Sequence, residues 1–229
     1  PDIPTWVPPS PTAGEIELDG QRTKILFEEK AGLVAIEIHQ REGGVLWREL
    51  AAPQAVSLGG KVTAGDAAAA VSLQPEDFVI AYEPQEAPVG LPFLMAEVRD
   101  RATLRRAQVN LDGMEALIGQ GVTPDVHLFT RADDGFDLRA RRFAPLDGVP
   151  EDPATGSANC ALPGMLPLRH ADVDGDFSFR IAQGVEMGRP SVLDARAEKR
   201  DGKVTETWIG GCSVMVADGQ IEVDDKGAG

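Results

Sequence analysis

The sequence has little from which a disulfide framework or a metal centre could be built. Two cysteines, Cys160 and Cys212, are too few for either a disulfide scaffold or a four-cysteine zinc site, which favours a reducing, cytoplasmic location. The three histidines, His39, His127 and His170, share no ligand spacing. We expect each to have a solvated or hydrogen-bonded role at the surface, and we expect no metal.

Basic residues and long apolar runs are also scarce. Lys plus Arg number 22 against 37 Asp plus Glu, a net charge of −15. This charge repels nucleic acids and anionic membrane surfaces, and an anionic ligand would need a local positive group to bind. No apolar run approaches the ~18 residues that a membrane span requires. We therefore expect neither nucleic acid nor membrane as a partner.

Several widespread catalytic and nucleotide-binding motifs are missing: GxGxxG, the P-loop, HExxH, CxxC and GxSxG. What remains is a chain of 229 residues with 42% hydrophobic content. Its length allows one large domain or two small ones, with an ordinary apolar core.

Two parts of the chain show the same order of strand, glycine turn and strand. Leu33–His39 alternates apolar and polar residues and leads through a glycine turn to Val45–Leu50. Phe177–Ala182, Val192–Lys199 and Val204–Ile209 repeat the plan. The shared order favours two similar α/β halves, with a coincidence of β-hairpins as the alternative.

Helices are predicted between these strands. Asp66 is placed to cap a short helix over Ala67–Leu73. Arg101–Ile118 has a helical pattern that is interrupted near Asn110.

One segment combines features of a binding site. After a strand that ends at Phe143, Thr155 can cap a helix whose first-turn amides, at Gly156 and Ser157, stay open to a ligand. Those donors and the helix dipole form an anion site, and Asp152 brings a carboxylate beside it. A bound acid next to such a group outlines a proton-transfer site. A capped turn, with the acidic side chains only complementing the helix dipole, explains the segment equally well.

The segment Glu151-Asp-Pro-Ala-Thr-Gly-Ser-Ala-Asn-Cys-Ala161 resembles the signature of the phenazine-biosynthesis PhzF-like isomerase family. Further similar segments follow the family's order: Gly90–Leu94, Arg141–Pro145, Gln183–Ser191 and Gly210–Gly211. The resemblance implies an α+β, diaminopimelate-epimerase-like fold, in which two similar domains each curl a sheet around a central helix. It also implies isomerisation or epimerisation of a small carboxylic acid without a cofactor, by moving a proton between carbons in the cleft between the domains.

The resemblance also implies the site residues. Asp152 corresponds to the motif aspartate of the cleft and is the predicted catalytic residue. Five positions are predicted to bind the substrate or line the cleft: Thr155, Gly156, Ser157, Gly210 and Gly211. The two C-terminal glycines fit a bulge before the last strand equally well.

Full-length relatives begin with several dozen further residues that include the catalytic glutamate, whereas this chain enters the pattern near Thr23. We therefore expect a first domain, residues 1–86, that is incomplete and leaves an exposed apolar face on its strands. Residues 87–206 form the second domain, with a last strand near 207–223 returning to the first.

Pro167 should end or kink the motif helix early, and Cys160 should be a buried small residue.

Two alternatives follow from the missing glutamate. The chain could be a non-catalytic module that binds a small acid, which predicts binding without proton exchange. It could also be an interaction protein whose incomplete half is covered by a partner or by a second copy, as in a homodimer.

Overall fold

The computed structural model describes residue 18 and residues 22–29, 32–40 and 45–212. In these residues the strands form one mixed sheet in the order β1-β2-β3-β11-β10-β9-β7-β6-β5-β4, with β8 added to β7. The strands are β1 (Arg22–Glu29), β2 (Gly32–Gln40), β3 (Leu46–Ala51), β4 (Gln85–Glu86), β5 (Leu94–Glu97), β6 (Val126–Arg131), β7 (Leu138–Ala144), β8 (Val149–Asp152), β9 (Gly175–Gln183), β10 (Ser191–Arg200) and β11 (Lys203–Cys212). The helices are α1 (Ala64–Ala70), α2 (Arg101–Arg106), α3 (Leu111–Gly119) and α4 (Gly156–Leu168), with short 3-10 turns at Pro75–Asp77 and Pro145–Asp147.

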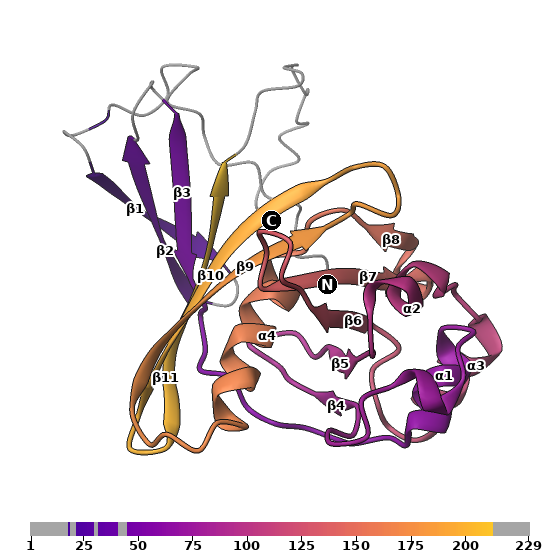
Figure 1. Ribbon diagram of the computed structural model, residues 1–229. Helices are drawn as coiled ribbons and strands as arrows, with labels where there is room; N and C mark the ends of the chain where they lie inside the picture. The colour runs from indigo at the N-terminus through magenta and orange to yellow at the C-terminus, as the bar shows by residue number, and fades with distance from the viewer. Residues whose placement is uncertain (1–17, 19–21, 30–31, 41–44, 213–229) are drawn as a thin grey trace, which may run out of the picture.

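Helix α4 is the central element of the fold. It packs against β9, β10 and β11, and Figure 1 shows the sheet curling around it. Residues 158–167 of the helix are all buried. Pro167 lies in the last turn of the helix, which ends one residue later at Leu168, so the predicted end of the helix at this proline agrees with the structure. At the C-terminal end, the Lys199 ammonium donates to the carbonyls of Pro167 and His170, at 2.8 and 3.0 Å.

Helices α1 and α3 pack together into a second apolar core with β5 and β6, away from β1–β3 (Figure 1). The predicted cap of the first helix is wrong. Thr63, not Asp66, is the N-cap, and Asp66 completes a capping box from inside the helix. The predicted interruption near Asn110 is confirmed, because Asn110 caps α3 through its side chain.

The first three strands join the rest of the sheet through β11, which pairs with β3 over Trp208–Cys212. Val34, Ile36 and Ile38 alternate on one face of β2, as their spacing predicts, but the predicted exposure of this face is wrong. The three side chains are buried and contact apolar residues that include Phe27. The domain boundary near residue 86 stays a prediction.

None of the described helices combines the length and apolarity that a membrane crossing requires.

Candidate functional site

Asp152 stands at the end of β8, opposite Arg142 of β7. Its side chain is 25% exposed. One carboxylate oxygen, Oδ2, accepts a 2.6 Å hydrogen bond from the Thr155 hydroxyl and lies 3.8 Å from the Arg142 guanidinium. The other oxygen, Oδ1, accepts only a longer bond, 3.3 Å, from the Ala154 amide. The carboxylate is therefore partly exposed, and its shorter hydrogen bond is at Oδ2.

The N-terminus of α4 begins three residues further on. Thr155 is the N-cap residue, but its side chain makes no capping hydrogen bond. Its hydroxyl donates to Asp152, and its oxygen accepts from Gln183. The first-turn amides of Gly156 and Ser157 have no acceptor within the helix. A Cβ added at Gly156 would meet nothing within 4 Å, so there is free space beside the first turn of the helix. The structure thus brings a carboxylate and the N-terminus of a helix together, and a helix N-terminus favours negatively charged groups.

The two C-terminal glycines of the predicted site lie in β11. Gly210 is buried, and the Trp47 ring fills the space that a side chain at Gly210 would occupy. Gly211 is half-buried, and a Cβ there would lie 3.2 Å from the Val192 carbonyl oxygen. A binding role for the two glycines stays a prediction.

Glu151, the acidic residue before Asp152 in the motif, is engaged elsewhere. Arg141 binds both of its carboxylate oxygens at 2.8 Å. The same guanidinium donates to the carbonyls of Leu104 and Ala107, each at 2.9 Å, at the end of α2. Glu151 therefore links β8 to the end of α2. Asp152 instead contacts Thr155 and Arg142.

A buried amide pair that the sequence did not reveal lies behind Asp152. The Gln183 side chain, fully buried at the end of β9, donates to the Asp152 carbonyl at 2.6 Å and to the Thr155 hydroxyl at 3.0 Å. Its oxygen accepts from the Thr155 amide and from the Asn159 side chain. The only sequence signal was that Gln183 begins one of the segments similar to the family.

His127 is fully buried in β6, so the predicted surface role is wrong. Neither ring nitrogen meets the geometry of a full hydrogen bond in the part of the chain that the structure describes, although the Asn159 side chain lies close to the ring. Burial, and next the positive charge of Arg142, lower the pKa of His127 to about 3, while Asn159 opposes the shift. The ring is neutral near pH 7 and supports the site as an uncharged group.

This burial predicts a pH-dependent stability. Below pH 6.5, the ordinary pKa of histidine, His127 is protonated in the unfolded chain. In the folded chain its pKa is about 3, so it stays neutral there. Stability should fall as the pH falls, by about 2 kcal/mol at pH 5 and about 3 kcal/mol at pH 4 for this group. Urea unfolding of wild type and of His127→Leu at several pH values measures how far the free energy of unfolding depends on this group. A wild-type curve parallel to that of the variant would contradict the prediction.

The Arg142 guanidinium lies near three carboxylates. It donates to Asp125 at 2.7 Å and lies 3.8 Å from both Asp147 and Asp152. Burial raises the pKa of Asp125, and the charge of Arg142 opposes that shift. One guanidinium among three acids leaves no spare positive charge here. That the amides of α4 bind an anionic ligand stays a prediction.

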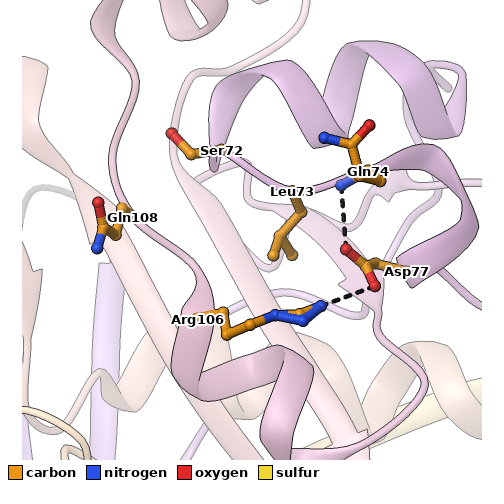
Figure 2. A pocket seen from close by; sticks show the side chains of 6 residues that line it. All are labelled: Ser72, Leu73, Gln74, Asp77, Arg106 and Gln108. Atoms are coloured by element: carbon orange, nitrogen blue, oxygen red, sulfur yellow. Dashed lines mark hydrogen bonds and ion pairs between the residues drawn. The ribbon is translucent and has the colours of Figure 1, made fainter.

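Figure 2 shows a hollow that is separate from this site. It has a volume of about 630 Å³ and is lined by Ser72, Leu73, Gln74, Asp77, Arg106 and Gln108. The Asp77 carboxylate accepts from the Gln74 amide at 3.1 Å and from Arg99 and Arg106 at 2.7 and 2.8 Å. These bonds, that of the Gln74 amide first, lower the pKa of Asp77. The charges are mutually satisfied, so we assign no chemistry to this hollow.

Glu37, His39 and Glu49 bring atoms of metal-ligand type within 4.8 Å of one another. However, Arg196 holds both carboxylate oxygens of Glu49 at 2.8 Å, and Arg22 lies 4.0 Å from Glu37. A divalent cation would have to displace a bidentate guanidinium and approach a second one. We therefore assign no metal to this cluster, and the absence of a metal stays a prediction.

Comparison with known families classifies the chain. The model of a family described as phenazine biosynthesis-like protein (PhzC-PhzF) matches residues 13–219. The chain belongs to this family. The predicted membership in the PhzF-like family is therefore confirmed.

Individual relatives agree with this assignment. Over 90 residues the chain is 42% identical to trans-2,3-dihydro-3-hydroxyanthranilate isomerase from Pseudomonas chlororaphis, a match covering 39% of this chain and 32% of the relative. The chain thus spans about a third of the length of this curated relative.

Solved structures show the same fold. A PhzF-family protein from Bacillus anthracis superposes with a TM-score of 0.73 at 19% identity, over 88% of this chain and 68% of that one. A predicted epimerase from Pseudomonas aeruginosa has a TM-score of 0.68 at 25% identity, over 89% and 68%. The predicted α+β, epimerase-like fold is confirmed.

Proposed function

We propose that the chain carries the acid-binding part of a PhzF-like isomerase site, which moves a proton between carbons of a small carboxylic acid without a cofactor. One observation carries the proposal: the partly exposed Asp152 carboxylate and the open first-turn amides of α4 lie within one short loop. The relative that is named an isomerase of a cyclic hydroxy amino acid supports the reaction class.

The chemistry follows from these groups. Loss of a proton from a carbon beside a carboxylate places negative charge on the carboxylate oxygens, and the amides of Gly156 and Ser157 stabilise that charge. Asp152 orients the acid and the moving proton with the oxygen that Thr155 leaves accessible. One C–H bond breaks, another forms and the double bond shifts between them. The reaction needs no oxidant or reductant.

A solvent-exchange experiment tests the proposal. The purified chain is incubated in D₂O with trans-2,3-dihydro-3-hydroxyanthranilate, and NMR follows deuterium entering carbon positions. Incorporation faster than in buffer supports the isomerase. Binding without incorporation would replace the isomerase with the acid-binding module, and absence of binding would overturn both. A homodimer and a cytoplasmic location stay predictions.

The amides of α4 can be tested directly with Ser157→Pro. Proline is tolerated in the first turn of a helix but has no N–H, so the helix should form while one donor to the acid is lost. Loss of one hydrogen bond to a charged group corresponds to about 10- to 100-fold weaker binding of a carboxylate such as anthranilate. Calorimetric titration measures this, with Ser157→Ala reporting the contribution of the hydroxyl alone. An unchanged dissociation constant would rule out the anion site.

A further inference from the structure

Gln183 and Asn159 form a buried amide pair whose donors and acceptors are fixed by the backbone. The Asn159 amide donates to the Thr155 carbonyl at 2.7 Å, and a carbonyl can only accept. The same nitrogen contacts the Gln183 side chain, which must therefore present its oxygen there. The Gln183 nitrogen then faces the Asp152 carbonyl, a second obligate acceptor, at 2.6 Å. Two backbone carbonyls thus fix both amides in one orientation.

This orientation determines the direction of the Thr155 hydroxyl. Gln183 donates its remaining N–H to the hydroxyl oxygen at 3.0 Å. The hydroxyl has a single proton and receives a bond on its oxygen, so its own proton points to Asp152 Oδ2 at 2.6 Å. Oδ2 thereby receives the shorter bond, while Oδ1 accepts only the 3.3 Å bond from the Ala154 amide within the described residues and keeps more capacity to accept from substrate.

We propose that Gln183 is a positioning residue of the isomerase site, which makes Oδ1 of Asp152 the oxygen that meets substrate by directing the Thr155 hydroxyl to Oδ2. The inference rests on the proposed function and deepens it. Gln183 is fully buried and reaches Asp152 through Thr155 and through the Asp152 backbone, so it has no contact with substrate. The neighbouring His127 is neutral, so the buried group behind the site carries no charge of its own.

A glutamate at position 183 distinguishes a residue that directs the Thr155 hydroxyl from one that only stabilises the fold. In Gln183→Glu, a protonated carboxyl has one donor in place of the two N–H groups of the amide and still accepts at its other oxygen. When that proton goes to the Thr155 hydroxyl oxygen, the hydroxyl proton still points to Asp152. An ionised carboxylate can only accept, and it would draw the Thr155 hydroxyl away from Asp152. Burial raises the pKa of such a carboxyl, so both forms fall within an accessible pH range.

The kinetic test compares kcat for the trans-2,3-dihydro-3-hydroxyanthranilate reaction in wild type and Gln183→Glu between pH 5.5 and 9. We expect the variant to approach wild type at low pH and to fall about 100-fold below it as the introduced carboxyl ionises. KM should change little. A constant ratio of the two rates across the pH range would overturn the proposal.

Two further variants keep the test decisive. Thr155→Val removes the hydroxyl link, and it should lower kcat by a similar factor at every pH, even if Gln183→Glu fails to fold. Lys199→Met removes two hydrogen bonds at the far end of α4, and it should leave kcat unchanged. A full rate in Thr155→Val would overturn the proposal.

A structural readout separates this inference from the proposed function. In wild type, NMR should detect a slowly exchanging Thr155 hydroxyl proton coupled to the Asp152 carboxyl carbon. In Gln183→Glu that coupling should be lost at high pH and regained at low pH. If wild type shows no isomerisation, the proposed function fails while this measurement still decides the role of Gln183. If the Thr155 hydroxyl proton of Gln183→Glu stays coupled to the Asp152 carboxyl carbon at both pH values, Gln183 does not direct the hydroxyl.

Discussion

Asp152→Asn should reduce deuterium incorporation into the acid substrate by about 10²–10⁴-fold, because the variant loses the one partly exposed carboxylate beside the amides of α4. Asparagine has the same shape, and its oxygen can still accept from the Thr155 hydroxyl. The loop should therefore keep its conformation, with stability changed by no more than about 1 kcal/mol. NMR-detected exchange and urea unfolding measure the two quantities separately.

Asp147→Asn is the matched control for the loss of charge. Asp147 lies 3.8 Å from Arg142, the same distance as Asp152, but its side chain is 64% exposed and it lies in the 3-10 turn before β8. This variant should retain its exchange rate. If Asp152→Asn keeps its rate within tenfold of wild type, Asp152 has no part in proton transfer.

Gly184→Ala should both destabilise the protein and disturb the site. Gly184 has a φ of +75°, and a Cβ there would overlap the Arg189 carbonyl oxygen and lie 2.7 Å from the Pro153 carbonyl oxygen. Backbone strain and steric overlap together predict a loss of about 2–5 kcal/mol in the free energy of unfolding. Pro153 directly follows Asp152, so a shift of this backbone displaces the carboxylate, and we expect a fall in kcat of about 100-fold.

Gly188→Ala isolates the cost of the backbone conformation. Gly188 has a φ of +78°, but a Cβ there meets nothing within 4 Å. We expect a loss of about 1–2 kcal/mol and an unchanged kcat. Urea unfolding measures both losses. Equal losses in the two variants would show that the contacts of Gly184 with Arg189 and Pro153 do not contribute to the destabilisation.

Local patterns in the sequence were sufficient for the main features of the site. Loop and helix signals located Asp152 beside the helix start at Gly156, and the structure places both there. Alternating residues predicted which side chains share one face of β2, although not that this face is buried, and the motif segment predicted the family that the comparison confirms. Such features depend on neighbours within a few residues, which a sequence records directly.

The tertiary structure decided the features that depend on distant parts of the chain. Gln183 holds the Asp152–Thr155 loop from 28 to 31 residues away, and His127 became buried because β6 lies between β5 and β7. Hydrogen-bond partners and burial arise from packing between elements, and no local period in the sequence encodes them.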